Sequence, residues 1–413
     1  MDMNRFTKAF IILTGALLLS WLLPWCYHFV FSKPFESPLT LYSPVTHDFM
    51  RFEWQKEDVG GYDMAGNAYT PAEFDSLMPT VNYFQLNRDN RLPKEIEGIP
   101  FNLRKVEHSN FVFRSFPRNY NRPQTGLYQM FDGATIKDGL KIPDEVFRMT
   151  SEGLEFIVMN TNKVEEELSR RFTNALLDKG FVFPARNLHY DDDVEKKYDN
   201  GFLLIDHEGS LFQLKRIDNQ PLCRQIPLPD SLDLTHAFVT EYKDRRLLGF
   251  LRDRDGGFYA LESHNLSLHK LPISPFDPLT QQMVISGDMF YWNVIRENAA
   301  YEDIEALDAR DYHLVKTLHT DFPVFQWKKV RSWIFPFRLD FRSGYDRYMK
   351  PRFSSWSWNA LPMGLLLALA WFFIQRRYRR HRNEAPWIGW TESVGVLLFG
   401  WYLFLPLLLT LRR

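Results

Sequence analysis

The chain has very few cysteines: Cys26 and Cys223 are the only two among 413 residues. Cys26 lies in an apolar run and Cys223 stands alone in the middle of the chain, so a disulfide framework is not expected. The motifs G-x-x-x-x-G-K, H-E-x-x-H, G-x-S-x-G and C-x-x-C are also missing. These absences disfavour P-loop nucleotide hydrolysis, zinc peptidase, serine-hydrolase and thioredoxin-like chemistry.

Charged residues are scarce at the two ends of the chain. The first 31 and last 58 residues hold nine of the 50 Lys and Arg and three of the 51 Asp and Glu. The middle of the chain therefore has 41 basic and 48 acidic residues, an excess of negative charge that does not suit nucleic acid as a partner.

The first apolar run, Ala9–Phe31, is 23 residues without a charged side chain if His28 is neutral. At about 1.5 Å per residue it is long enough to cross a bilayer core of about 30 Å. A cleaved signal peptide is the alternative, but no small-residue cleavage site follows the run. Residues 1–31 are predicted to be a signal anchor.

Two further apolar runs, 356–374 and 387–411, predict two more transmembrane helices joined by a basic loop over 375–386. By the positive-inside rule this loop is cytoplasmic, which puts residues 32–355 in the periplasm and makes the chain a multi-pass protein of the cytoplasmic (inner) membrane. A cytoplasmic domain is the alternative, because five basic residues also approach the second span from the domain side. The loop residues that set the topology are Arg376, Arg377, Arg379, Arg380 and Arg382.

Small residues recur four positions apart in the C-terminal runs, a spacing that lets helix backbones approach closely. Glu392 is an acid within an apolar run, where it either bonds to another helix or reaches back to the interface. We expect a surface here for the membrane helices of a partner, formed by Gly364, Ala368, Gly389, Glu392 and Ser393.

The middle of the chain contains a repeat. The segment from Gly209 matches the segment from Gly256, and Leu214, Leu261 and Leu307 follow one another at separations of 47 and 46 residues. A further copy is expected from Gly126. Alternating apolar residues on both sides of Gly-containing turns predict β-hairpins in each copy.

A unit of about 46 residues with four short strands is typical of a propeller blade. The sequence therefore predicts a mainly β, β-propeller-like domain, with a two-sheet sandwich as the alternative. One amphipathic helix is expected as an insertion over 162–180, starting from a capping box of Asn162 and Glu165 and ending at Gly180.

Candidate chemical groups in this domain have simpler explanations. The acidic run 191–193 has the oxygen ligands that Ca²⁺ prefers but not the ligand spacing of a calcium loop. Asp206 and Asp253 occur at corresponding turns, where turn geometry accounts for them. We therefore assign no catalytic, cofactor-binding or metal-binding residue and expect no cofactor.

Residues 324–358 contain eleven aromatic and eight basic residues against two acidic ones. This composition suits the lipid headgroup zone or the membrane-proximal surface of a partner. The alternative is a set of final strands joined to a short stem.

Several idiosyncratic stretches resemble a family of Bacteroidales membrane proteins, domain of unknown function 4857. The resemblance is carried by LLPW at the end of the anchor, GGYDMAGNAYTPAEFDSLMP (60–79), NRLPKEIEGIPF (90–101), GFVFPARNL (180–188) and QRRYRR (375–380). It implies an accessory membrane protein that works with an ABC transporter, and it implies no catalytic residue.

These observations favour a non-enzymatic accessory or sensor subunit of an ABC-type transporter. Its expected partners are the membrane or ATPase subunits of the transporter and membrane lipid. The alternative is a membrane-tethered hydrolase or lyase that uses a propeller cleft; polar groups converging on the cleft, with perturbed carboxylates, would favour it.

Overall fold

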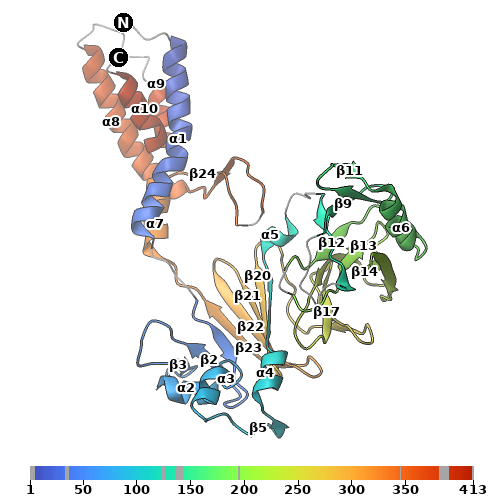
Figure 1. Cartoon of the computed structure of the whole chain (residues 1–413). Coiled ribbons are helices and arrows are strands. Elements are labelled where there is room, and N and C mark those ends of the chain that lie inside the picture. The colour runs from blue at the N-terminus through green and yellow to red at the C-terminus, as the bar shows by residue number, and fades with distance from the viewer. Residues whose placement is uncertain are drawn as a thin grey trace. The chain divides into compact units, whose positions relative to one another are not determined.

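Figure 1 presents the chain as a computed structural model. The structure describes residues 5–32, 37–121, 126–134, 143–193, 196–344, 346–380 and 390–411. The chain divides into two compact units, one formed by Met1–Ser37 with Phe322–Arg413 and the other by Pro38–Asp321. We call them the helical unit and the β domain and describe each by itself.

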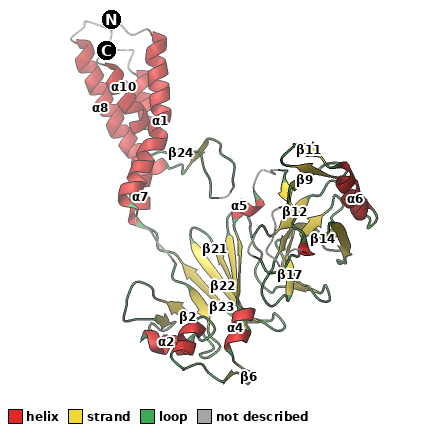
Figure 2. Cartoon of the chain, viewed as in Figure 1, coloured by secondary structure: helices red, strands yellow, loops and turns green. Residues whose placement is uncertain are grey.

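The β domain is built from five antiparallel sheets, each of which contains four strands that follow one another in the chain (Figure 2). Sheet I is β1 (Thr40–Tyr42), β2 (Phe49–Phe52), β3 (Gly61–Asp63) and β4 (Ala68–Tyr69). Sheet II is β8 (Tyr128–Gln129), β9 (Glu145–Met149), β10 (Leu154–Val158) and β11 (Lys163–Val164). Sheet III is β12 (Asn187–Tyr190), β13 (Phe202–Ile205), β14 (Leu211–Ile217) and β15 (Gln220–Ile226).

Sheet IV is β16 (Leu234–Val239), β17 (Leu247–Asp253), β18 (Phe258–Glu262) and β19 (Leu268–Lys270). Sheet V is β20 (Gln282–Gly287), β21 (Tyr291–Glu297), β22 (Tyr301–Asp308) and β23 (Leu314–Asp321), extended by β7 (Phe111–Ser115), which pairs with β20. The segment between sheets I and II also contains α2 (Pro71–Leu77), α3 (Tyr83–Arg88), the β5–β6 hairpin (Glu95–Ile96 with Ile99–Pro100), α4 (Leu103–Ser109) and α5 (Pro117–Tyr120).

The sheets stack face to face, and each neighbouring pair shares an apolar core. Such cores join sheets II and III, III and IV, IV and V, and V and I. Sheet III is therefore covered on both faces, which explains why all four residues of β13 are buried. Among the described residues no core cluster joins sheets I and II, so the sheets follow one another as blades do without forming a closed propeller.

The repeat predicted from the leucine spacing lies in equivalent places of three sheets. Leu214, Leu261 and Leu307 each lie on the third strand of their sheet and are fully buried. Each belongs to the core that its sheet shares with the preceding sheet. The separation of 46 to 47 residues thus corresponds to one sheet.

The turns between second and third strands are also equivalent. Gly209 and Gly256 have φ of 100° and 87°, a conformation that glycine adopts readily. Asp206 accepts hydrogen bonds from the backbone N–H groups of residues 208–210, at 2.8–3.0 Å. Asp253 accepts one from Gly257 at 2.6 Å. These two aspartates are turn residues, as their spacing predicted.

Two sequence predictions in this region were wrong in detail. The copy expected from Gly126 is out of register, because β8 is the first strand of sheet II and not its third. The insertion forms α6 (Glu166–Leu177), which is shorter than 162–180. Asn162 has φ of 51° and is followed by β11, and Glu165 is the N-cap, so the expected capping box does not form.

The helical unit contains α1 (Arg5–Phe31), α7 (Gln326–Ile334), a β24–β25 hairpin (Arg338–Asp340 with Arg352–Ser354), the 3₁₀ turn η2 (Trp358–Ala360), α8 (Leu361–Arg380), α9 (Trp390–Phe399) and α10 (Trp401–Leu411). Two helical stretches, Phe6–Phe31 and Trp358–Tyr378, are long and apolar enough to cross a membrane. The region 324–358, for which strands or a stem were the alternative, forms α7 and the β24–β25 hairpin.

The third predicted span, 387–411, is not one continuous helix in its described part. It is interrupted at Gly400, whose φ is 56°, and α9 and α10 have only 10 and 11 residues. At about 15 Å each, either helix reaches roughly halfway across a bilayer core of about 30 Å.

The chain folds back on itself at Gly400. The side chain of Leu403 on α10 lies against Gly395 on α9, and Val396 shares an apolar cluster with Phe404. Farther along α10, Pro406 lies against Gly15 of α1. The two short helices therefore form a hairpin, and hydropathy could not reveal it because the apolar residues continue through the turn.

Candidate functional site

A polar pocket in the β domain has a volume of about 340 Å³ and opens where loops of sheets III and IV approach each other. The β14 strand supplies one wall, the turns before β13, β17 and β19 supply most of the rest, and Gly133 comes from the segment after β8. Its lining residues are Gly133, Tyr198, Asp199, Asn200, Lys215, Arg216, Ile217, Arg245, Ser263 and His264.

Basic side chains outnumber acidic ones in this pocket. The ammonium group of Lys215 donates to the carbonyl oxygen of Asp199 at 2.9 Å, and the guanidinium group of Arg245 lies 4.6 Å from the ring centre of Tyr198. Arg216 pairs with Glu145 at 3.2 Å. Among the described residues neither Lys215 nor Arg245 has a carboxylate partner at ion-pair distance, so the pocket keeps positive charge.

Burial makes that charge significant. It lowers the pKa of Lys215, since desolvation disfavours the charged ammonium group. An anion that entered the pocket would be attracted to Lys215 and Arg245 in surroundings that screen charge less than water does. The arrangement therefore suits a small anionic ligand.

Next to the pocket lies a buried ion-pair network. Lys196, whose side chain is 3% exposed, contacts Asp199 at 2.6 Å and Glu241 at 3.1 Å. The backbone N–H of Asn200 donates to Glu241 at 2.5 Å. Burial raises the pKa of Glu241 to about 8, despite the nearby Lys196. Burial by itself would lower the pKa of Lys196. Attraction by Asp199 and Glu241 has the larger effect, so the pKa of Lys196 is raised.

This network meets the pocket wall at Asp199. The side chain of Glu241 is 1% exposed and does not line the pocket. Asp199, which does line it, is engaged by Lys196. Lys196, Glu241, Lys215 and Arg245 were not predicted from the sequence, because Lys215 lies on β14 and the other three come from the loops before β13 and β17. The available signal was the occurrence of basic residues near the hairpin ends of successive repeats.

The residues predicted to contact a partner's membrane helices pack largely within the chain's own helical unit. A Cβ atom at Gly364 would collide with the carbonyl oxygen of Leu397, so α8 and α9 approach closely here. Ala368 is buried in the same helix cluster. Glu392 accepts hydrogen bonds from Trp371, at 3.3 Å, and from Gln375. Ser393 on α9 is half-buried, and Gly389 lies outside the described residues.

The basic residues that predicted the topology begin within a helix and not in a loop. Gln375–Arg380 are still part of α8, where Arg376 and Arg377 are exposed. Arg379 and Arg380 continue the same helix, and Arg382 lies outside the described residues.

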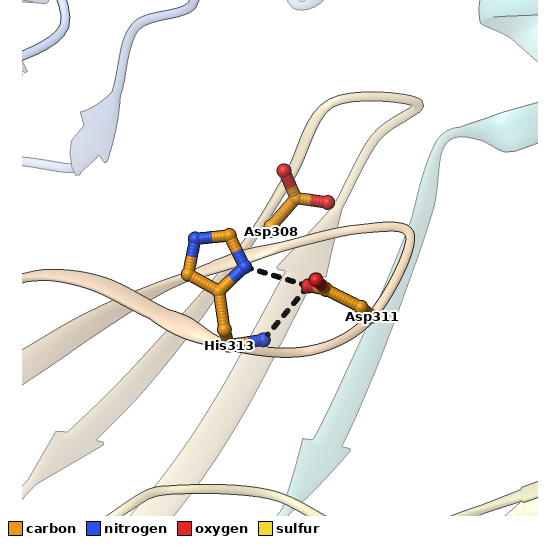
Figure 3. A group of neighbouring side chains, drawn as sticks. All are labelled: Asp308, Asp311 and His313. Atoms are coloured by element: carbon orange, nitrogen blue, oxygen red, sulfur yellow. Dashed lines mark hydrogen bonds and ion pairs between the residues drawn. The ribbon is translucent and has the colours of Figure 1, made fainter.

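One group of described residues has the composition and closeness of a metal site: Asp308, Asp311 and His313, at the turn between β22 and β23 (Figure 3). Asp311 accepts hydrogen bonds from the ring and the backbone of His313, at 2.6 and 3.1 Å. Asp308 pairs with Arg310, which lowers the pKa of that carboxylate. The side chains of this group therefore already have hydrogen-bond and ion-pair partners within the turn, and we assign no metal to them.

The thiol of Cys223 has no catalytic surroundings. Cys223 lies on β15 opposite Leu214, and burial raises its pKa to about 11. A thiol with a raised pKa is a poor nucleophile at neutral pH, so Cys223 is a packing residue.

Comparison with solved structures finds proteins of very low similarity, two of which are described as propellers. They include the Cps50 (Swd1) β-propeller domain of Myceliophteria thermophila (8% identity, TM-score 0.27, 48% of this chain and 56% of that chain). The Dos1 propeller has 10% identity and a TM-score of 0.26 over 43% of this chain and 44% of that chain. PorZ of the type-IX secretion system of Porphyromonas gingivalis has 10% identity and a TM-score of 0.23 over 71% of this chain and 33% of that chain.

The chain thus spans about half the length of the first two of these proteins, and the sheet arrangement described above rests on its own strand pairing and cores. No curated protein matches the chain. Residues 39–307 match the family described as domain of unknown function (DUF4857). The chain belongs to this family.

Proposed function

We propose that this DUF4857 protein is a non-enzymatic accessory or sensor subunit of an ABC-type transporter. In this proposal α1 and α8 cross the cytoplasmic (inner) membrane, and the β domain lies in the periplasm. The membrane and ATPase subunits of the transporter are the proposed partners. The transporter assignment comes from the family resemblance stated above.

The observation that carries the proposal is the extent of the helical unit. A single helix such as α1 is enough to tether a domain, yet the chain adds α8 and the α9–α10 hairpin. Gly364, Ala368 and Glu392 hold these added helices together. The outer face of α8 remains exposed and apolar at Leu366 and Phe373, which are 63% and 62% exposed. That face supports contact with lipid or with the helices of another subunit.

The β domain supplies the sensing part of the proposal. Its basic pocket fits a small anionic ligand, with Lys215 and Arg245 as the charged contacts. A hydrolase or lyase would need a perturbed carboxylate in the pocket, and Glu241 is buried away from it. Binding is therefore favoured over catalysis.

Affinity purification tests the proposal. The tagged full-length chain is extracted from its native membranes in mild detergent, and the co-eluting proteins are identified. The expected result is a transporter membrane subunit together with an ATPase subunit. A matched variant, Lys215→Gln with Arg245→Gln, should retain both, because the proposed contact is made by the helices and not by the pocket. Recovery of the chain without transporter subunits would contradict the proposal.

A further inference from the structure

Two pockets adjoin each other in the helical unit, at the end where α1 finishes and α8 begins. One has a volume of about 310 Å³ and is mainly apolar, with walls from Trp358, Leu361, Leu398 and Phe399. The other has a volume of about 190 Å³. They share Phe337, Trp356 and Ser357, so they form one continuous surface.

The smaller pocket is basic. Arg331 and Arg338 both line it, together with Ser332, Ser355 and Ser357. Arg338 pairs with Asp340 at 2.6 Å. Arg331 contacts Ser355 at 3.5 Å and lies 5.9 Å from the ring centre of Trp327, and among the described residues it has no carboxylate at ion-pair distance.

The smaller pocket has more positive than negative charge. Burial and then repulsion by Arg338 lower the pKa of Arg331, and Asp340, which opposes this shift, already pairs with Arg338. A phosphate group is the natural complement, because it accepts several hydrogen bonds from guanidinium and hydroxyl groups at once.

The larger pocket is complementary to a hydrocarbon chain. Trp356 and Trp358, at 69% and 81% exposed, carry large rings at the end of the apolar helices, where indoles prefer the boundary between lipid and water. Leu361, Leu398 and Phe399 continue the apolar surface into the turn between α9 and α10. An acyl chain lying there would have its headgroup next to Arg331.

We propose that this double pocket binds one anionic phospholipid, with the phosphate at Arg331 and Arg338 and part of an acyl chain against Trp358, Leu398 and Phe399. The site belongs to the helical unit alone and does not depend on a transporter partner. It gives the aromatic and basic stretch 324–358 a specific ligand.

Native mass spectrometry of the full chain in detergent tests the proposal, with phosphatidylglycerol and phosphatidylcholine of identical acyl chains as probes. The wild-type chain should retain one phosphatidylglycerol in preference to phosphatidylcholine. Arg331→Gln with Arg338→Gln should weaken that retention by about tenfold or more, as expected for loss of charge-assisted hydrogen bonds. The matched control, Arg342→Gln with Arg347→Gln, removes the same charge from exposed residues outside both pockets and should retain the lipid.

A second variant tests the acyl-chain part without a change of charge. Leu398→Trp fills the apolar pocket and should also release the lipid. Glycerol phosphate, which lacks acyl chains, should not displace the bound lipid at equal concentration. Equal retention of the two lipids, unchanged retention in both pocket variants, equal loss in the Arg342 and Arg347 control, or displacement by glycerol phosphate would overturn the proposal.

Discussion

Leu261 in sheet IV occupies the place that Leu214 occupies in sheet III. Both are fully buried on the third strand of their sheet, and both pack into the core shared with the preceding sheet. This equivalence makes the β domain a series of similar sheets whose stability depends on the contacts between neighbours.

Replacing Leu261 by Ala should remove packing from the core between sheets III and IV. We expect the free energy of unfolding to fall by about 2–5 kcal/mol, since a buried leucine leaves a cavity. Denaturant unfolding of the full chain in detergent measures the change. Leu222→Ala is the control, because Leu222 is 53% exposed on β15, and it should cost less than about 0.5 kcal/mol. Equal effects of the two substitutions would argue against the core described here.

Replacing Gly364 by Leu should force α8 away from α9. The new side chain would collide with the backbone at Leu397, so we expect the helical unit to lose about 1–3 kcal/mol or more of stability. Thermal unfolding in detergent measures the loss. The control is Ala370→Leu, which adds most of the same side chain, all but its Cβ atom, at an exposed position of α8. If both variants unfolded like the wild type, the close contact between α8 and α9 would be wrong.

Glu241 should make the β domain less stable as the pH rises. Its pKa is about 8 in the folded state, above the value of about 4.3 expected in the unfolded chain. Between these two pKa values the folded state holds a proton that the unfolded state releases. The contribution of Glu241 to the free energy of unfolding is therefore complete below about pH 4.3 and is lost as the pH rises through 8. The free energy of unfolding, measured from pH 5 to 8, should fall less steeply in Glu241→Gln.

The exposed Glu208 provides the matched control for this measurement. Glu208→Gln should keep the wild-type slope of stability against pH. If Glu241→Gln had the same slope as the wild type and the control, burial would not determine the protonation of Glu241.

The topology can be tested with a reporter that is active only outside the cytoplasm. It should be active when fused after Leu232 and inactive after Arg382, since the β domain is proposed to be periplasmic and the basic segment cytoplasmic. The reverse pattern would place the β domain in the cytosol.

A third fusion, at the C-terminus, distinguishes two topologies for residues 387–411: a hairpin of α9 and α10, or one helix that crosses the membrane once. Because α9 and α10 fold back at Gly400, the reporter after Arg413 should be inactive, like the one after Arg382. Activity at the C-terminus would mean that 387–411 crosses the membrane once, as its hydropathy alone predicts.

The sequence revealed the repeat because strands that are buried in the same way need apolar residues at the same spacing. Leu214, Leu261 and Leu307 carry this signal, and Asp206 and Asp253 mark the turns. The copy at Gly126 was misplaced because a glycine followed by alternating apolar residues fits a first strand as well as a third one.

Features made by distant residues could not be predicted in the same way. Lys196 meets Glu241 across 45 positions of the chain, and their pairing is set by how sheets III and IV pack. Gly364 and Glu392 were singled out by residue type, but only the packing of α8 on α9 shows that they contact residues of their own chain. The proposed lipid pocket likewise combines residues that are far apart in the sequence, such as Arg331 and Phe399.

Photocrosslinking in native membranes tests whether the helices bind a transporter. A photoreactive amino acid is placed at Phe373, which is 62% exposed on α8, and in a second protein at Trp371, which is 1% exposed within the chain's own helices. We expect Phe373 to form a crosslink to a membrane subunit of an ABC-type transporter and Trp371 to form none. Adducts to lipid alone at Phe373, in membranes that contain the wild-type level of the protein, would contradict this expectation.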